Sequence, residues 1–114
     1  MKRGTYYEER ACQYLTERGL TLVTKNFRSR YGEVDLVMRD GQTLVFVEVK
    51  FRASSAHGSP LEAVTFSKQR RIKRSALFYL TQTNSYYDAV RFDVLGITMI
   101  GKTEKYVWVK GAFE

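Results

Sequence analysis

The sequence is poor in cysteine, proline and histidine, and it has no long apolar segment. Each of the three residue types occurs once in 114 residues. The single cysteine, Cys12, excludes an internal disulfide and suits a reducing compartment. No apolar run approaches the roughly 18 residues of a membrane-spanning helix, and the N-terminal residues lack the apolar core of a signal peptide. We therefore expect a cytoplasmic protein that does not enter a membrane.

Negative charge is also in short supply. The chain has 19 Lys and Arg residues but 12 Asp and Glu residues, so its formal net charge is +7. Such a balance favours an acidic partner, and we expect nucleic acid, although a membrane surface or an acidic protein would also suit the charge. With 114 residues, 44% of them hydrophobic, the chain can form one hydrophobic core but not two. We therefore expect a single domain over residues 1–114.

Residues 32–52 predict a β-hairpin with carboxylates on one face. Two runs rich in β-branched residues flank Asp40-Gly41, a dipeptide typical of hairpin turns. Alternate residues of a strand share a face. A two-residue turn at Asp40-Gly41 makes Glu48 the diagonal neighbour of Asp35, whereas a four-residue loop over 40–43 puts Glu48 directly opposite. Either register groups both carboxylates beside Lys50.

Carboxylates grouped in this way need a compensating cation. Like charges opposite one another in a sheet are destabilising by up to ~1 kcal/mol, and partial burial adds a desolvation cost. Mg²⁺ or Mn²⁺ prefers such oxygen ligands and completes its shell with water and substrate phosphate. Asp35 and Glu48 would then hold the metal while Lys50 orients a water molecule. The alternative is a half-exposed hairpin in which Lys50 forms a salt bridge with Asp35 or Glu48.

The spacing of these residues resembles a known nuclease motif. Asp35, a dozen intervening residues and then Glu48-x-Lys50 resemble the active site of PD-(D/E)xK nucleases, with Val34 in place of the motif's proline. From Gly4 to Asp93 the chain resembles the YraN-like family of uncharacterised bacterial proteins, which are similar to archaeal Holliday-junction resolvases. The resemblance implies a restriction-endonuclease-like core and a Mg²⁺- or Mn²⁺-dependent endonuclease that cuts branched or otherwise structured DNA.

A further carboxylate, Glu8, lies on a predicted N-terminal helix. This helix runs from Gly4 to Arg18, with Thr5 as a candidate N-cap and Gly19 as its C-terminal glycine. Glu8 lies on the border of the helix face that is expected to be buried. Related resolvases carry a first-helix glutamate that joins the metal site, and the resemblance gives Glu8 that role. Because Glu8 is three residues after Thr5, a capping box explains it equally well.

Two basic segments are candidate phosphate-binding surfaces. One is the turn over residues 28–32, which follows a predicted strand at 20–27. The other belongs to a helix predicted over 60–81, interrupted near Thr65 to Ser67, with Ser67 as a candidate N-cap. Its charge is almost of one sign, and like charges repel unless an anion compensates them, although a solvated face is the alternative. The predicted nucleic-acid-binding residues are Arg28, Arg30, Lys68, Arg70, Arg71 and Arg74, of which Lys68 is expected to face the active site.

Four further residues have roles that the sequence leaves open. His57 lies in a small, polar segment after the hairpin, where a lone histidine is more often neither a base nor a ligand. Arg91 and Asp93 share one face of a strand predicted over 89–98, so they either support the site or form an ion pair with each other. Trp108 fits the core better than a base-stacking role.

The predicted order of elements is one helix, three strands, a second helix and two strands. The connection from the strand of Glu48 and Lys50, through the second helix, to the strand of Arg91 is long enough for a parallel crossover. We therefore predict an α/β fold with a mixed central sheet flanked by helices on both faces. The preferred function is a metal-dependent DNA endonuclease, and the alternative is a DNA-binding or structure-recognising module without turnover. RNA as a substrate and a homodimer both stay open.

Overall fold

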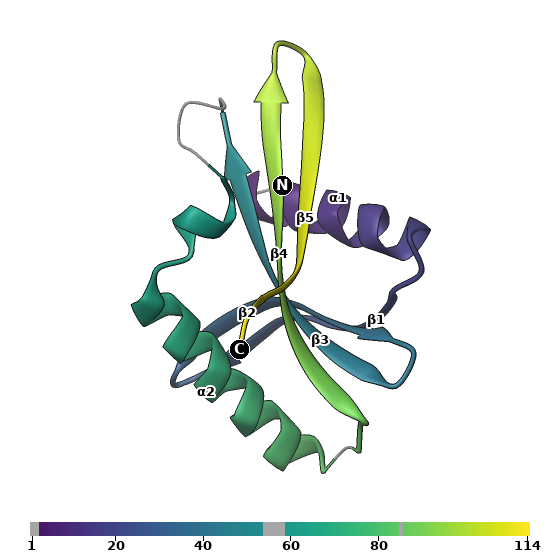
Figure 1. Cartoon of the computed structure of the whole chain (residues 1–114), viewed down its shortest axis with the longest axis vertical. Helices are drawn as coiled ribbons and strands as arrows, with labels where there is room; N and C mark the ends of the chain where they lie inside the picture. Colours follow the sequence, from purple (N-terminus) through teal and green to yellow (C-terminus); the bar gives the residue numbers. More distant parts are fainter. Residues whose placement is uncertain (1–2, 54–58, 85) are drawn as a thin grey trace.

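The computed structural model describes residues 3–53, 59–84 and 86–114 (Figure 1). Over these residues the chain forms helices and strands in the order that the sequence predicts. They are α1 (Arg3–Glu17), β1 (Thr21–Ser29), β2 (Gly32–Asp40), β3 (Thr43–Arg52), the short 3-10 helix η2 (Leu61–Ala63), α2 (Phe66–Thr83), β4 (Ala89–Ile100) and β5 (Thr103–Phe113). None of the described helices is both long and apolar enough to cross a bilayer.

The five strands form one mixed sheet in the order β1-β2-β3-β4-β5. Neighbouring strands are antiparallel, except that β3 and β4 are parallel and are joined through α2. A parallel pair needs a long crossover connection, which the helix supplies. The prediction of an α/β fold with a mixed sheet is confirmed.

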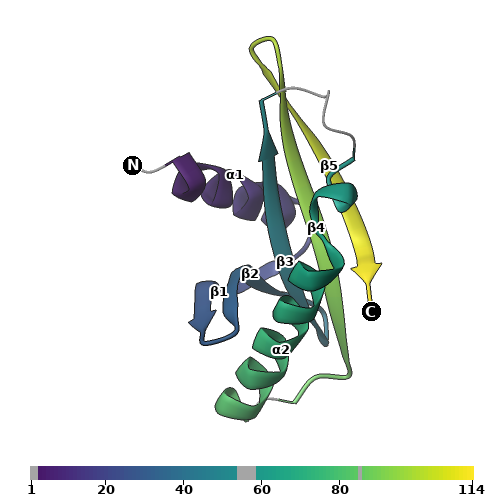
Figure 2. The ribbon, with the colours of Figure 1, turned by 90° about the vertical axis from the view of Figure 1, so that its left-hand side faces the viewer.

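The two helices cover opposite faces of the sheet (Figure 2). On one face α1 buries Ala11 and Leu15 against the central strands. On the other face α2 buries Ile72, Ala76 and Tyr79. Each of β2, β3 and β4 contributes buried residues to both clusters, because successive strand residues point to opposite faces. The helices therefore cover the central strands on both faces, and a ligand can reach these strands only beyond the ends of the helices.

The ends of the helices correct two details of the prediction. Gly19, at φ 102°, ends α1 as expected: the Leu20 N–H donates to the Leu15 carbonyl at 3.1 Å, as in a Schellman motif. However, α1 begins at Arg3, so Thr5 lies inside the helix and the prediction that it is the N-cap is wrong. At α2 the N-cap is Thr65 rather than Ser67, since Thr65 Oγ1 accepts from the Lys68 N–H at 3.1 Å.

The register of the central hairpin follows the longer of the two predicted loops. Arg39 pairs with Leu44 and Asp40 with Thr43, which leaves Gly41 and Gln42 as the turn. The two-residue turn at Asp40-Gly41 is therefore wrong. Gly41 adopts a φ of 62°, a left-handed conformation that glycine takes without strain.

Gly96 allows the chain after β3 to pack closely over β4. It pairs with Lys50 across the parallel ladder, and a Cβ atom at this position would lie 2.1 Å from Cγ of Pro60. Any side chain would therefore have to displace Pro60, which precedes η2 and α2. Gly96 thus allows Pro60, the residue before η2, to pack beside the part of β3 that carries Glu48 and Lys50.

Candidate functional site

The candidate site lies where β2 separates from β3. Backbone pairing between these strands extends from Asp40–Thr43 to Leu36–Val47 and ends there. Asp35 is the next residue of β2, and its Oδ2 accepts a hydrogen bond from the Val49 N–H at 2.8 Å. The side chain thus takes the place of a backbone acceptor. This hydrogen bond fixes the carboxylate at the point where β2 separates from β3, which we call the fork. Beyond it β2 pairs with β1 alone, while β3 continues beside β4 (Figure 1).

Three carboxylates meet at this fork. Glu8 of α1 and Glu33 and Asp35 of β2 each offer an oxygen within 4.8 Å of the other two. All three side chains are half-buried. Because α1 begins at Arg3, Glu8 lies beyond the first helical turn, so the capping-box explanation is wrong. This group could hold a metal ion.

Glu48 lies next to the three carboxylates, on the face of β3 that α2 covers. Only 4% of the residue is exposed, and its Oε2 lies 2.7 Å from Nζ of Lys68. This oxygen is fully buried, and among the described residues it has no well-directed hydrogen bond, because the lysine approaches at a poor angle. The carboxylate therefore has one close cation and lone pairs that remain available to a ligand.

Two cavities meet at Asp35 and Glu48. One, of about 240 Å³, faces α2 and is lined by Tyr31, Gly32, Glu33, Asp35, Glu48, Lys68, Arg71 and Ile72. The other, of about 400 Å³, is lined by Tyr7, Glu8, Asp35, Glu48, Val49, Lys50, Phe51 and Lys68. Asp35, Glu48 and Lys68 line both cavities, so a ligand in either cavity lies beside the same two carboxylate side chains.

Burial and mutual repulsion change the acidity of the carboxyl groups. Burial and the neighbouring Glu48 carboxyl group raise the pKa of Asp35 to about 10, although the hydrogen bond from Val49 opposes this shift. Burial also raises the pKa of Glu8, and the charge of Glu33 adds to it, while hydrogen bonds with Asp35 and Asn26 act in the other direction. Both shifts mean that the folded chain disfavours the charged carboxylates unless a cation is near.

The two lysines of the site behave differently. Burial and the adjacent Lys68 ammonium lower the pKa of Lys50. Burial opposes the charge of Lys68 as well, but its close pairing with the Glu48 carboxylate outweighs this effect and raises the pKa of Lys68. Lys68 is thus the cation that pairs with Glu48, and within the described part of the chain no ion pair joins Lys50 to Asp35 or Glu48. The salt bridge of Lys50 that the sequence offered as an alternative is not formed there.

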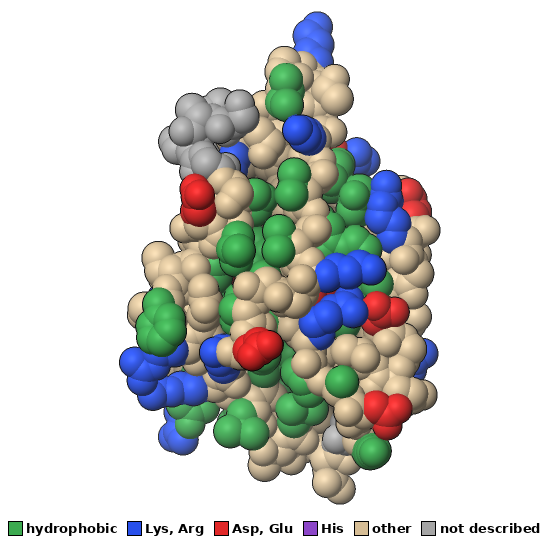
Figure 3. Space-filling view, viewed as in Figure 1, with side chains coloured by type: hydrophobic (Ala, Val, Ile, Leu, Met, Phe, Trp, Pro, Cys, Tyr) green, Lys and Arg blue, Asp and Glu red, His purple; other side chains and the backbone are tan. Residues whose placement is uncertain are grey.

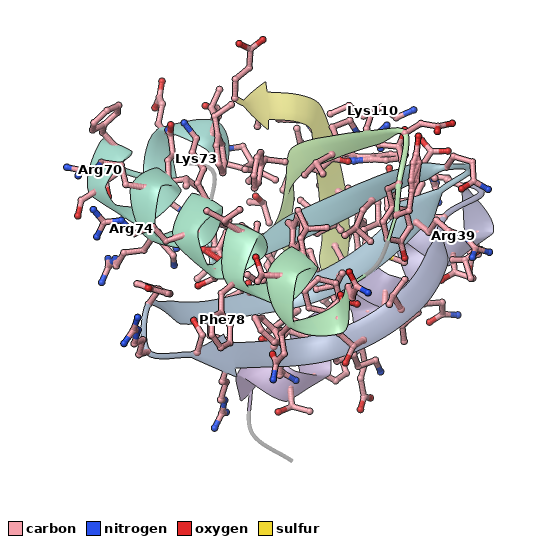
Figure 4. All side chains as sticks on the ribbon, turned by 90° about the horizontal axis from the view of Figure 1, so that it is seen from below. Arg39, Arg70, Lys73, Arg74, Phe78 and Lys110 are labelled. Atoms are coloured by element: carbon pink, nitrogen blue, oxygen red, sulfur yellow. The ribbon has the colours of Figure 1, made fainter. Side chains whose placement is uncertain are left out.

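The predicted phosphate-binding residues occupy different environments. Arg28 forms an ion pair with Glu33 at 2.7 Å, and the Arg30 guanidinium lies 5.1 Å from the centre of the Tyr31 ring. Arg71 lines the smaller cavity, and Arg70 and Arg74 are exposed. In Figure 3 Lys and Arg side chains gather over α2, and in Figure 4 Arg70 and Arg74 point away from the ribbon.

Sequence reasoning missed two residues of the site. Glu33 is two residues before Asp35, so strand periodicity places both side chains on one face. It was not predicted as a site residue, because it lies outside the nuclease motif that contains Asp35. Asn26 has a φ of 52° inside β1, and its side chain acts to lower the pKa of Glu8. An asparagine is among the residues that tolerate this backbone conformation. The alternating pattern of β1 does not predict a residue with positive φ at this position.

Arg91, Asp93 and Trp108 form a separate structural group. Asp93 is fully buried and accepts from Arg91 at 2.9 Å, from Trp108 Nε1 at 2.9 Å and from the Gly111 N–H at 3.0 Å. It pairs with Val47, so it points to the sheet face opposite Glu48. The ion pair is therefore the correct alternative, and Trp108 packs on the core. His57 lies outside the described residues.

These observations define an α/β protein whose mixed sheet carries a half-buried carboxylate group beside two lysines. Residues 7–97 match the Uncharacterised protein family UPF0102, and the chain belongs to this family. A UPF0102 protein of Rhodococcus jostii (strain RHA1) is 54% identical over 98 residues, covering 86% of this chain and 82% of the relative. One of Chromohalobacter salexigens is 46% identical over 113 residues, covering 99% and 91%.

The UPF0102 match confirms the resemblance to the YraN-like family. A UPF0102 protein of Vibrio cholerae is 44% identical over 112 residues, covering 96% of this chain and 90% of the relative. The family description names no activity. The likeness to nucleases therefore rests on Asp35, Glu48 and Lys50 alone.

Proposed function

We propose that the protein is a Mg²⁺- or Mn²⁺-dependent endonuclease that hydrolyses phosphodiester bonds in structured DNA. One observation carries the proposal: Glu8, Glu33 and Asp35 group their oxygens at the fork, with buried Glu48 and half-buried Lys50 beside them. Carboxylates gathered next to basic residues repel phosphate unless a cation lies between them. A module that only binds DNA gains nothing from this grouping.

The donor set fits a hard divalent cation. It consists of carboxylate oxygens, which suit Mg²⁺ and Mn²⁺, and Glu48 Oε2 is buried without a well-directed hydrogen bond among the described residues. Asp35 and Glu48 would hold the ion, with Glu8 as a further ligand and Glu33 close by. When bound, such an ion polarises the scissile phosphate and lowers the pKa of a coordinated water.

The remaining residues of the site have roles that follow from their charge. Lys50 is half-buried and has a lowered pKa, so it can accept a hydrogen bond from, and orient, the attacking water when its amine is neutral. Lys68 lies on the first turn of α2, where the helix dipole also favours an anion, and Arg71 lines the same cavity. These two cations would hold the phosphate while Asp35 stays fixed by the Val49 N–H.

Cleavage of a defined panel of nucleic acids tests the proposal. We expect labelled branched DNA to be cut in Mn²⁺ and not in EDTA, and we expect linear duplex, single-stranded DNA and RNA to be cut more slowly. The Glu48→Gln variant, purified in the same way, should be inactive, which excludes a contaminating nuclease. If the wild type cuts no member of the panel, a non-catalytic DNA-binding module becomes the better description.

Replacing Arg70, Arg71 and Arg74 together by glutamine should weaken DNA binding on every sequence. The logarithm of affinity should fall linearly with the logarithm of salt, and the slope should flatten by about 0.9 for each phosphate that is no longer neutralised. A matched control replaces the three exposed lysines of the β4–β5 hairpin, Lys102, Lys105 and Lys110. Fluorescence anisotropy at several salt concentrations measures both. If the arginine variant keeps the wild-type slope, α2 does not face nucleic acid.

A further inference from the structure

A groove between α2 and the turn that joins β1 to β2 adjoins the candidate site. Its volume is about 390 Å³, and it is lined by Tyr31, Arg74, Leu77, Phe78 and Thr81. The rings of Tyr31 and Phe78 lie 6.3 Å apart, centre to centre. Tyr31 also lines the cavity of Asp35 and Glu48, so one side chain borders both spaces. The groove is thus an apolar extension of the carboxylate site.

The groove is exposed although its lining is mostly apolar. Leu77 is 66% exposed and Phe78 38% exposed, on a helix that already buries a different stripe against the sheet. In Figure 4 Phe78 lies between α2 and the strands below it, while Arg74 points outward. Arg71, Arg74 and Phe78 follow one another at helical spacing, so a line of positive charge leads from the carboxylate site to the aromatic ring. Such a juxtaposition suits a ligand with an anionic end and a flat apolar end.

We propose that this groove binds an unpaired nucleobase whose phosphate lies at the carboxylate site. The inference rests on the proposed function in that it takes nucleic acid as the substrate. Every base has a π-face that can stack on Tyr31 or Phe78, and Arg74 and Arg71 lie where the adjoining backbone would pass. A base inside a duplex cannot enter the groove. The site would therefore prefer DNA with a nucleotide outside the base stack, as occurs at bulges and branch points.

Charge argues against a second copy of the chain as the occupant. Arg74 is the only charged residue among the described residues that line the groove, and exposed Arg70 and Arg71 lie close by on the same helix. A twofold interface through this groove would place the arginines of one copy near those of the other. Nucleic acid instead brings negative charge to them.

Equilibrium binding in EDTA tests the groove without any cleavage. The probes are a fluorescent duplex, the same duplex with one extra unpaired nucleotide, and a third in which that nucleotide is abasic. Wild type should bind the bulged duplex at least about fivefold more tightly than the other two. Phe78→Gln and, separately, Leu77→Gln should reduce this preference to about twofold or less and leave duplex affinity unchanged. Ile100→Gln, at a similarly exposed aliphatic residue on β4, is the control.

The outcomes separate the groove from the catalytic proposal. Two variants guard against misfolding, since Phe78 contacts Phe27 whereas Leu77 is largely exposed. Equal affinity of wild type for all three probes, or a preference that survives both substitutions, would overturn the inference. So would a wild-type dimer, seen by sedimentation, that Leu77→Gln dissociates. Failure of cleavage in Mn²⁺ contradicts the proposal of an endonuclease. The preference for the bulged duplex in EDTA tests the groove independently of cleavage.

Discussion

Lys50→Ala is expected to lower Mn²⁺-dependent cleavage at least about a hundredfold and to leave DNA affinity and melting temperature almost unchanged. The side chain belongs to the strand face that carries Glu48, and it lines the cavity of about 400 Å³ together with Glu8 and Asp35. Within the described residues it forms no ion pair with either carboxylate, because Lys68 is the partner of Glu48. Its loss should therefore remove water orientation without breaking a salt bridge.

Lys68→Ala is the informative comparison for this variant. It removes the cation 2.7 Å from the buried oxygen of Glu48, so it should lower stability in EDTA, because truncating one partner leaves a buried charge uncompensated. Lys105→Ala, at an exposed position of β5, should change neither the cleavage rate nor the stability in EDTA. Nicking rate, DNA affinity and melting temperature are measured on one preparation of each protein. Cleavage that survives in Lys50→Ala would keep an endonuclease but assign water activation to another group.

The sequence was informative about the site where strand periodicity applies. The order of elements and the shared face of Asp35 and Glu48 were predictable, because each follows from the period of a strand or a helix. Lys68 was expected to face the site because it lies at the start of the helix that follows the Glu48 strand. The sequence left two hairpin registers open, because both the two-residue turn and the four-residue loop place Asp35 and Glu48 on one face. The structure selects the register in which the pairing ends beside Asp35.

What periodicity does not encode is contact between distant segments. Glu33 joins the carboxylates because β2 separates from β3 at Asp35. Glu8 reaches the same point from α1. Since α1 begins two residues before Thr5, Glu8 cannot form a capping box with Thr5. Likewise, the choice between Lys50 and Lys68 as partner of Glu48 depends on how closely α2 approaches β3. Packing of α2 fixes that distance, and local sequence does not.

Asp35→Asn is expected to raise stability in EDTA and, at the same time, to weaken Mn²⁺ binding. The pKa of Asp35 is raised to about 10 by burial and by the Glu48 carboxyl group, well above the roughly 3.9 of an unfolded chain. The folded state therefore holds the proton more tightly. The stability contributed by protonated Asp35 is complete below about pH 4 and declines as the pH rises from there through about 10. Asparagine resembles the protonated form at every pH, so the variant should lack this decline.

The measurement is a series of melting curves from about pH 5 to about pH 9, with EDTA and with Mn²⁺. In EDTA the variant should melt above wild type by a margin that grows with pH, reaching at least about 4 °C, the shift expected for roughly 1 kcal/mol in a domain of this size. Mn²⁺ should stabilise wild type more at high pH, because binding must displace the proton, and should hardly stabilise the variant. Asp88→Asn, at an exposed carboxylate before β4, is the control. If wild type and Asp35→Asn gain equally from Mn²⁺, Asp35 is not a ligand, and the carboxylates at the fork must be explained without a metal.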